Sequence, residues 1–519
     1  MPSTARAPEP APEPGPVPAQ PVEPASDSQE FALPAEAGFL GDLEPAEFRT
    51  LAHATVDQIA DYLERLPSLP PLSPVQPGEL VRSLPGEAPL QGEPMDQILR
   101  DVDRLLLPGI THWAHPRFFA YFSSSGSAAG ILGEMLTAGL NVNAMLWRTS
   151  PAATELEVVV CRWLAQMMGL PDRCDGHIND TASTSTLIAL AAAREGLDQD
   201  IRKRGLAGRG DLPQIVVYAS EQAHSSVEKA VITLGLGQDG LRRVPVDSEY
   251  RMDSVALRRL VADDLSRGVL PMAIVATVGT TATTSIDPLP EIAEVSREYK
   301  LWLHVDAAYG GAMAVVPEWR GVLAGAELAD SLVVNPHKWL FTQLDCSVLY
   351  TARPEVLKRA FSLVPEYLTT PEAGRESGIG ARNLMDYGVS LGRRMRALKL
   401  WFVLRHYGQE GLAERIRQHV QMANWLADRI RRTSGWELSA PVPMATVCFR
   451  HLQPGRTSEA ELTEHNRRIM ARVNGNGEAF ISHAQLGDRL VLRVAVGSIR
   501  TKPSDLAALW DALQQSATD

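Results

Sequence analysis

The sequence predicts an α/β protein built on a mainly parallel sheet that helices cover on both faces. Short β-branched runs recur through the middle of the chain, and amphipathic helical stretches separate them. Strands that alternate with helices tend to pair in parallel, and a parallel sheet needs a helical layer on each face. The length of 519 residues, with 45% hydrophobic and 22% charged residues, fits a globular protein with a large core.

These patterns divide the chain into four predicted segments. Residues 1–32 are rich in Pro, Ala and Glu, a composition that cannot bury a core, and are expected to form a disordered tail. Residues 33–127 are expected to form a helical N-terminal dimerisation segment, because apolar residues recur at helical spacing between 48 and 66. Residues 128–397 form the predicted large domain, and residues 398–519 form a small α+β C-terminal domain.

The elements of the large domain follow one another as strand and helix. The runs that predict strands are residues 215–219, 272–277, 301–305, 331–334 and 347–350. Residues 225–234 and 289–299 have apolar side chains at helical spacing and predict two of the intervening helices. The sequence therefore predicts strands whose carboxyl ends lie together along one edge of the sheet.

Charge and cysteine content exclude several classes of partner. The formal net charge is −12, which argues against binding to nucleic acid or to an anionic membrane surface. The chain contains no apolar run of the roughly 18 residues that a membrane helix requires. The four cysteines have no paired spacing, which is typical of a reducing compartment, so a cytoplasmic protein is expected.

One strand runs directly into an unusual lysine. In DSLVVNPHKWLFT, residues 330–342, the apolar strand is followed by Asn335, Pro336, His337 and Lys338, and the chain then returns to apolar residues. A lysine in such surroundings most often extends its ammonium group to the surface. The other strand ends argue against that reading here, because ligands bind beyond the carboxyl ends of parallel strands and these ends carry reactive or polar side chains. Those side chains are His224, Thr281 and Asp306, and a hydroxyl-rich helix start adds Thr181, Ser183 and Ser185.

Each of these residues has an ordinary explanation when it is taken alone, as a helix cap, a turn residue or a structural histidine. Together they supply the groups that pyridoxal phosphate requires. The amine of Lys338 would hold the aldehyde as a Schiff base, and Asp306 would keep the pyridine nitrogen protonated. His224 would stack on the ring, and the hydroxyl groups at the helix start, with Asn335, would anchor the phosphate.

With these residues identified, the chain resembles the pyridoxal-phosphate-dependent group II amino-acid decarboxylases, and most closely the aromatic-L-amino-acid decarboxylases. The likeness extends from about residue 40 to the C-terminus and includes THWAHPRFFAYF, SPAATELE, SEQAHSSVEKA, HVDAAYGG, NPHKWLF and LGRRMRALKLWFV. It implies an aspartate-aminotransferase-type (fold type I) protein that works as a homodimer, with residues 128–397 as the cofactor-binding domain. It also implies cofactor contacts from Ser124, Ala182, Ser183, His224, Thr281, Asp306, Asn335, His337 and Lys338.

The resemblance also suggests the reaction. Tyr367 matches the family tyrosine that protonates the α-carbon after carbon dioxide leaves, which implies an amine product and not an aldehyde. Trp113 and Phe122 match the family's aromatic substrate pocket, whereas Asn143 and Met145 replace an isoleucine and a phenylalanine and make the pocket more polar. The expected activity is decarboxylation of an aromatic L-amino acid. The alternatives are an aldehyde synthase, an aminotransferase or a decarboxylase for a non-aromatic amino acid.

Other motifs are weaker. GLGQDG, residues 235–240, matches the dinucleotide pattern G-x-G-x-x-G but follows a predicted helix, so glycine termination of that helix explains it better than a nicotinamide site. The pairs Cys174/His177 and His112/His115 resemble half of a metal site and have no second pair, so no metal is expected.

Overall fold

A computed structural model describes residues 41–363, 382–453, 455 and 458–518 of the chain. The chain consists of two units, Met1–Asp57 and Gln58–Asp519. Helix α1 (Pro45–Arg65) starts in the first unit and continues into the second, which confirms the helix predicted from the apolar spacing. In the described part of the chain, no helix combines the length and the apolarity needed to cross a membrane.

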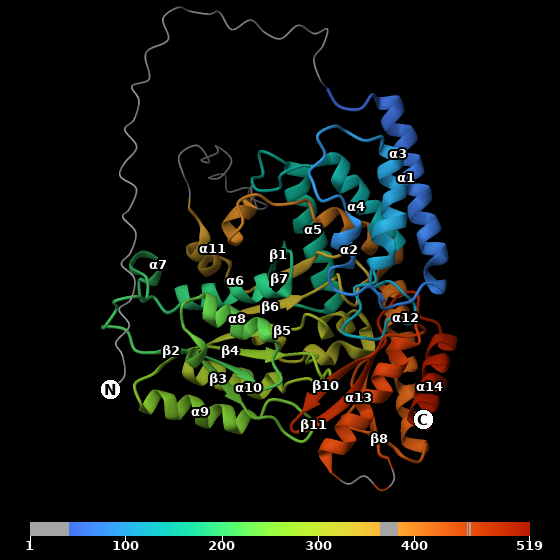
Figure 1. Cartoon of the computed structure of the whole chain (residues 1–519). Coiled ribbons are helices and arrows are strands. Elements are labelled where there is room, and N and C mark those ends of the chain that lie inside the picture. Colours follow the sequence, from blue (N-terminus) through green and yellow to red (C-terminus); the bar gives the residue numbers. More distant parts are fainter. Residues whose placement is uncertain (1–40, 364–381, 454, 456–457, 519) are drawn as a thin grey trace, which may run out of the picture. The chain divides into compact units, whose positions relative to one another are not determined.

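The second unit contains a seven-stranded sheet with the strand order β1-β7-β6-β5-β4-β2-β3 (Figure 1). Strands β3, β2, β4, β5 and β6 run parallel, and β7 is antiparallel to both of its neighbours, β6 and β1. The mainly parallel sheet predicted from the sequence is therefore confirmed. The strands are β1 (Asp175–Asn179), β2 (Ile215–Ser220), β3 (Leu241–Val244), β4 (Leu270–Thr277), β5 (Trp302–Asp306), β6 (Ser331–Val334) and β7 (Ser347–Thr351).

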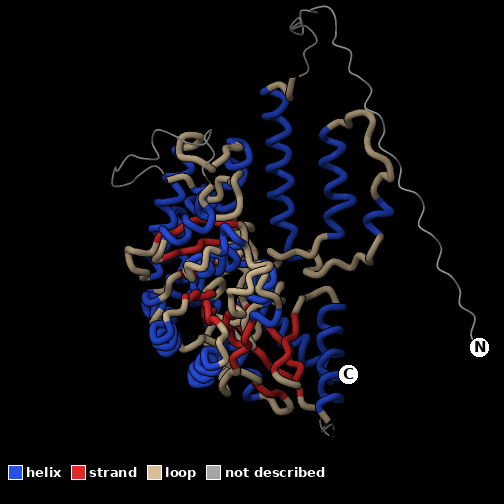
Figure 2. The backbone as a smooth tube through the Cα atoms, turned by 90° about the vertical axis from the view of Figure 1, so that its left-hand side faces the viewer, coloured by secondary structure: helices blue, strands red, loops and turns tan. Residues whose placement is uncertain are grey.

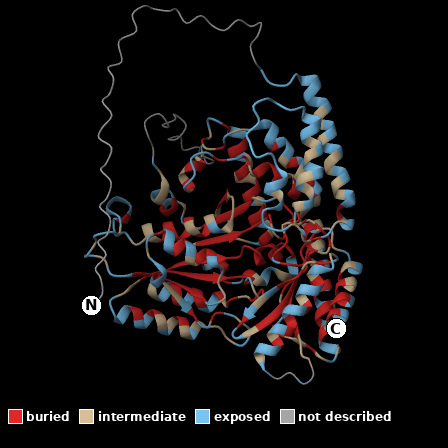
Figure 3. Cartoon of the chain, viewed as in Figure 1, coloured by how far each residue is buried: buried red, intermediate tan, exposed pale blue. Residues whose placement is uncertain are grey.

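Alternate residues along the strands enter two separate hydrophobic clusters, one on each face of the sheet. In β2 and β4, Val217 and Val275 pack with helices α6, α8 and α11, whereas Val216 and Ile274 pack with α5, α9, α10 and α12. Figure 3 shows that the strands between these layers are buried. The helices are α5 (Pro151–Met168), α6 (Ala182–Glu195), α8 (Ser225–Thr233), α9 (Ser254–Ser266), α10 (Leu289–Tyr299), α11 (Pro354–Phe361) and α12 (Ala397–Arg432).

The C-terminal part adds a four-stranded antiparallel sheet with the order β10-β11-β9-β8, which lies beside the C-terminal helix in Figure 2. Its apolar residues join the cluster that covers one face of the large sheet, so the two sheets share a continuous core. Its elements are β8 (Trp436–Leu438), β9 (Thr446–His451), α13 (Glu459–Gly475), β10 (Ser482–Leu486), β11 (Arg489–Ala495) and α14 (Pro503–Thr518). The remaining α-helices are α2 (Glu79–Ser83), α3 (Met95–Asp101), α4 (Ala128–Leu140) and α7 (Ile201–Arg204).

Candidate active site

Lys338 lies in a tight turn just beyond the carboxyl end of β6. Its backbone N–H donates to the carbonyl oxygen of Asn335 at 2.9 Å, and the N–H of Thr342 donates back to Pro336 at 3.1 Å. This turn directs the lysine side chain into a cavity of about 670 Å³, which we call the Lys338 cavity. The cavity is lined by Trp113, Tyr121, Phe122, Ser124, Glu221, Gln222, Ala223, His224, Thr281, Ala282, Lys338, Ser482, His483, Ala484, Gln485 and Arg493.

The surroundings of Lys338 favour its neutral, nucleophilic form. Burial lowers the pKa of the Lys338 amine, and the positive charge of Arg493 lowers it further, while the negative charge of Asp306 partly opposes both effects. The side chain keeps some solvent access through the cavity, so the amine can be reached by a small molecule. A lysine with a lowered pKa on a cavity wall is suited to forming a covalent bond with an aldehyde.

Asp306 is the last residue of β5, the strand beside β6, and only 5% of its surface is exposed. Its Oδ1 accepts a hydrogen bond from the N–H of Ala308 at 3.1 Å. No ion pair to an arginine or lysine is formed by this carboxylate within the described part of the chain. Its charge acts on Lys338 and on His224, raising the pKa of each. Asp306 is therefore a buried carboxylate whose field extends over the site.

His224 caps the start of α8 and lines the Lys338 cavity. Its Nδ1 accepts from the backbone N–H of Ser226 at 3.1 Å and lies 2.8 Å from the Ser226 hydroxyl. Because Nδ1 is an acceptor, the proton of the neutral ring is assigned to Nε2. Burial lowers the pKa of His224, so the ring is mostly neutral at pH 7. A neutral flat ring is suited to stacking on an aromatic cofactor.

Arg493 is a site residue that the strand-end reasoning did not find. It belongs to β11 and is 3% exposed. Its Nε donates to the carbonyl oxygen of Ala282 at 3.1 Å, and its Nη1 donates to that of Tyr121 at 2.9 Å. Its Nη2 is buried without a hydrogen-bond partner among the described residues. A guanidinium held by two carbonyl groups on a cavity wall can bind an anionic group of a ligand.

A stack of aromatic rings supports one wall of the Lys338 cavity. The ring of Phe122 lies on Tyr309 with centroids 3.8 Å apart, and Tyr309 stacks on Trp339 at 4.7 Å. Phe122 also has the Lys338 Nζ 5.3 Å and the Arg493 Cζ 4.7 Å from its centroid. The stack therefore holds an aromatic surface next to both cations.

The residues expected to bind the cofactor are only partly gathered at this cavity. Ser124 and Thr281 line it, and Asn335 and His337 are buried in the turn that carries Lys338. His337 accepts at Nδ1 from the N–H of Cys346, and burial lowers its pKa to about 3. Ala182 is the first residue of α6 and is not among the lining residues. Ser183, also at the start of α6, and the buried Ser185 do not line it either; Ser185 instead bonds to Asn179 and Ser347 in the core.

These groups fit pyridoxal phosphate on the chemistry of the donor set. The Asn335 amide oxygen is buried without a partner among the described residues, so this amide is available to a ligand. Thr181, the N-cap of α6, makes no side-chain cap, which leaves the backbone N–H groups of the first turn available to an anion. Together with Lys338 and Asp306, the site offers an amine, a carboxylate and anion-binding groups.

Three predicted residues lie elsewhere or outside the description. Asn143 accepts at Oδ1 from the N–H of Arg393 at 3.0 Å, and its Nδ2 lies 3.3 Å from the sulfur of Met145. Neither Asn143 nor Met145 lines the Lys338 cavity of its own chain. Tyr367 lies outside the described residues.

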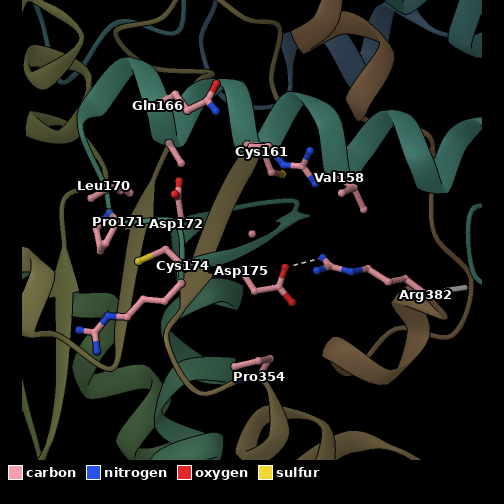
Figure 4. A pocket seen from close by; sticks show the side chains of 14 residues that line it. Val158, Cys161, Gln166, Leu170, Pro171, Asp172, Cys174, Asp175, Pro354 and Arg382 are labelled. Carbon is pink, nitrogen blue, oxygen red and sulfur yellow. Dashed lines mark hydrogen bonds and ion pairs between the residues drawn. The ribbon is translucent and has the colours of Figure 1, made fainter. Parts of the chain in front are cut away.

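A second cavity, of about 520 Å³, lies at the opposite edge of the large sheet (Figure 4). Asp175, where β1 starts, and Pro354, which follows the end of β7, both line it, and these strand ends lie at the edge away from Lys338. Arg382 pairs with Asp175 across this cavity, and Cys161 of α5 forms part of its wall. Ligands of parallel sheets bind at the other edge, so this cavity is not the active site.

Fold and site together define a class, the enzymes that hold an aldehyde cofactor on a lysine at the carboxyl edge of an α/β sheet. Comparison with known proteins agrees with this class. Residues 77–452 match the pyridoxal-dependent decarboxylase conserved domain. Tyrosine decarboxylase 4 from Petroselinum crispum is 40% identical over 490 residues, covering 92% of this chain and 94% of that protein. Phenylacetaldehyde synthase from a Rosa hybrid cultivar is 39% identical over 489 residues, covering 92% and 94%.

Solved structures are similar over the same length. The crystal structure of Oryza sativa TDC with PLP and tryptamine has a TM-score of 0.88 and 36% sequence identity, covering 92% of this chain and 99% of that one. The chain belongs to the pyridoxal-dependent decarboxylase family. The predicted family, the cofactor pyridoxal phosphate and the carboxy-lyase class are thereby confirmed, as is the fold type I architecture.

Proposed function

We propose that the protein decarboxylates an aromatic L-amino acid to the corresponding amine and carbon dioxide. The observation that carries this proposal is the pair of cations on one aromatic wall: Lys338 and Arg493 both lie near the ring of Phe122. One cation is placed to hold the cofactor and the other to hold a carboxylate. The substrate then lies between them against Phe122 and Trp113, whose faces suit an aromatic side chain.

The groups at and around the Lys338 cavity would have separate roles in binding pyridoxal phosphate. When bound, pyridoxal phosphate supplies an aldehyde for the substrate's amino group and a ring that takes up electrons when the bond to the carboxylate breaks. Lys338 would hold the cofactor between turnovers, and Asp306 would keep the pyridine nitrogen protonated. His224 would stack on the ring. Ser124, Thr281, Asn335 and His337, with the first turn of α6 at Ala182 and Ser183, would bind the phosphate and the ring substituents.

Arg493 would bind and orient the substrate carboxylate. Its free Nη2–H donates to one carboxylate oxygen, and the buried position of Arg493 strengthens this charge-assisted hydrogen bond. The carboxylate is consumed in the reaction, so the contact belongs mainly to the substrate complex. Binding of this kind contributes more to KM than to kcat.

The test of the proposed function is a product analysis over the twenty amino acids. Holoenzyme is incubated with each amino acid in turn, and carbon dioxide, amine and aldehyde are measured. Carbon dioxide with a matching amine is expected from tyrosine, tryptophan or phenylalanine, or from DOPA, which is added to the set. Release of carbon dioxide only from non-aromatic amino acids would contradict the aromatic assignment, because the Trp113 and Phe122 surface would then be unused.

A second candidate function, an aldehyde synthase, is favoured by one observation: phenylacetaldehyde synthase is similar to this chain over nearly its whole length. We expect Tyr367 to decide between the two. By the family resemblance its phenol donates a proton to the α-carbon, a contribution of about 10²–10⁴ in rate. Without that proton, dioxygen oxidises the α-carbon by two electrons and water supplies the carbonyl oxygen, so the products are an aldehyde, ammonia and hydrogen peroxide.

We therefore expect Tyr367→Phe to keep releasing carbon dioxide while its product changes from amine to aldehyde. The measurement is the amine-to-aldehyde ratio under air, with cofactor occupancy confirmed by absorbance. Wild type handled in parallel provides the reference ratio. A mutant that makes amine as fast as wild type would show that Tyr367 is not the proton donor.

We further propose that the active protein is a homodimer and that it is located in the cytoplasm. The location is supported by the four cysteines, which form no disulfide. Exposed apolar side chains recur every four residues along one face of α4, with 55%, 51% and 59% of their surfaces exposed, and they are Leu132, Leu136 and Leu140. Such a stripe calls for a partner surface. In the dimer, Asn143 and Met145, which follow α4, would reach the Lys338 cavity of the second copy.

We expect Leu136→Asp to give a monomer that has lost most of its activity, because a buried unpaired carboxylate at the interface is strongly unfavourable. Light scattering and cofactor content are the measurements. Leu265→Asp is the matched control, because Leu265 is an exposed leucine near the end of α9 and does not belong to the α4 stripe. This variant should leave the dimer intact. A dimeric, active Leu136→Asp protein would exclude α4 from the interface.

A further inference from the structure

The loop that follows β4 contains a chain of buried hydroxyl groups whose residues, Thr280, Thr283 and Ser285, do not line the Lys338 cavity. Thr280 and Thr283 are completely buried, and Ser285 is 3% exposed. The hydroxyls of Thr280 and Thr283 lie 3.1 Å apart, and those of Thr283 and Ser285 lie 2.8 Å apart. The chain ends where the Ser285 hydroxyl donates to the carbonyl oxygen of Glu249 at 2.7 Å.

The donor and the acceptor of each hydrogen bond among these three hydroxyl groups can be assigned. A carbonyl oxygen only accepts, so the Ser285 proton is used on Glu249, and Thr283 must then donate to Ser285. The proton of Thr283 is thereby used, so Thr280 must donate to Thr283. The Thr280 oxygen in turn accepts from the N–H of Ser285 at 3.0 Å. Thr283 is thus both donor and acceptor, and it is the central link of the chain.

Thr283 is joined by a peptide bond to Ala282, whose carbonyl oxygen is the acceptor for Arg493. The same oxygen receives the Nε–H of Arg493 at 3.1 Å and the thiol of Cys448 at 3.2 Å. The orientation of the peptide between Ala282 and Thr283 therefore sets where the guanidinium lies. No ion pair of Arg493 with a carboxylate is present among the described residues, so its position depends on such carbonyl contacts.

We propose that Thr283 is a positioning residue that determines the recognition of the substrate carboxylate by holding Arg493 through the Ala282 carbonyl group. This inference rests on the proposed function, in which Arg493 binds the carboxylate. Thr283 touches neither substrate nor cofactor. Its hydroxyl fixes the loop, the loop fixes one acceptor of the guanidinium, and the guanidinium presents its free Nη2–H to the cavity.

The test uses two probes that differ in the group that Arg493 would bind. Phenylpropionate carries the carboxylate and lacks the amine, whereas phenylethylamine carries the amine and lacks the carboxylate. Binding of each to holoenzyme is measured by calorimetry at equal cofactor occupancy. Thr283→Val, which keeps the shape and removes the hydroxyl, should weaken phenylpropionate by about tenfold and leave phenylethylamine unchanged.

Three further variants make the result specific. Thr283→Ser retains a hydroxyl and should restore phenylpropionate binding. Thr154→Val, at a buried threonine whose hydroxyl donates to the carbonyl oxygen of Ser150 at the start of α5, should change the binding of neither probe. In an Arg493→Gln background, Thr283→Val should cause no additional loss, because the two residues act through one contact. In turnover assays Thr283→Val should raise KM and leave kcat nearly unchanged.

Equal weakening of both probes by Thr283→Val, or no weakening of either, would overturn the positioning role. So would a full tenfold loss that persists in the Arg493→Gln background. Failure of the proposed function is distinguishable from these outcomes: wild-type holoenzyme would then bind neither probe and release no carbon dioxide from any aromatic amino acid.

Discussion

Replacement of Lys338 by alanine should lower the rate of decarboxylation by at least about 10³-fold. A general acid–base group contributes about 10²–10⁴ in rate, and Lys338 would in addition form the covalent bond to the cofactor. No other side chain could replace it in binding the aldehyde, because among the described residues Lys338 is the only amine on the wall of the Lys338 cavity. Borohydride reduction of wild-type holoenzyme, followed by peptide mapping, should place a pyridoxyl group on Lys338. The alanine variant should give no such adduct.

A second buried lysine provides the control for this experiment. Lys399 is 1% exposed, and its Nζ lies 3.1 Å from a carboxylate oxygen of Glu134, so its charge is paired. Burial alone therefore does not identify the reactive lysine, and the adduct should be absent from Lys399. A pyridoxyl group on Lys399 or on any residue other than Lys338 would show that the cavity has been assigned to the wrong amine.

The part of the site that sequence reasoning could find lies at the ends of parallel strands. Val334 ends β6, and Lys338 follows four positions later. The apolar β-branched run and the lysine among apolar residues were therefore enough to predict the turn that carries Lys338. Asp306 and His224 were found in the same way, because Asp306 is the last residue of β5 and His224 follows the end of β2 by four positions. Parallel strands bring these ends to one edge, which makes local sequence informative about a distant neighbour.

Other elements gave no local signal of their position. Strands β1 and β3 escaped prediction because DGHIN and LRRV are short and polar, and only their pairing with β7 and β2 makes them strands. Arg493 comes from the small antiparallel sheet, to which the strand-end rule does not apply. The sequence does contain one sign of Arg493: it is a charged residue inside the largely apolar run RLVLRVAV, just as Lys338 is a charged residue among apolar neighbours.

Asn143 and Met145 show a different limit. Family likeness assigned them to the substrate pocket, yet in a single chain they contact Arg393 and the apolar residues Leu146 and Met385. Sequence patterns carry no information on which copy of a chain completes a site. In the homodimer proposed above, Asn143 and Met145 would reach the cavity of the second copy, so the dimer experiment bears on substrate choice as well as on assembly.

Asp306→Asn should lower decarboxylation by about 10²–10⁴-fold, the range expected when a group that controls protonation in the reaction is lost. The substitution is nearly isosteric, and the asparagine Oδ1 can still accept from the N–H of Ala308, so the turn after β5 should persist. Only the charge is removed. That charge would hold the pyridine nitrogen protonated, and without it the ring withdraws fewer electrons from the α-carbon.

The same variant has a readout that does not depend on turnover. The Asp306 carboxylate raises the pKa of the Lys338 amine against the effect of burial, so its removal should lower that pKa further. Capture of pyridoxal phosphate by apoenzyme requires the neutral amine, and its pH midpoint should therefore move to lower pH in Asp306→Asn. Asp330→Asn is the matched control, because Asp330 precedes β6 at the opposite edge of the sheet and should leave the midpoint unchanged. An Asp306→Asn protein with wild-type activity and an unshifted midpoint would remove Asp306 from the site.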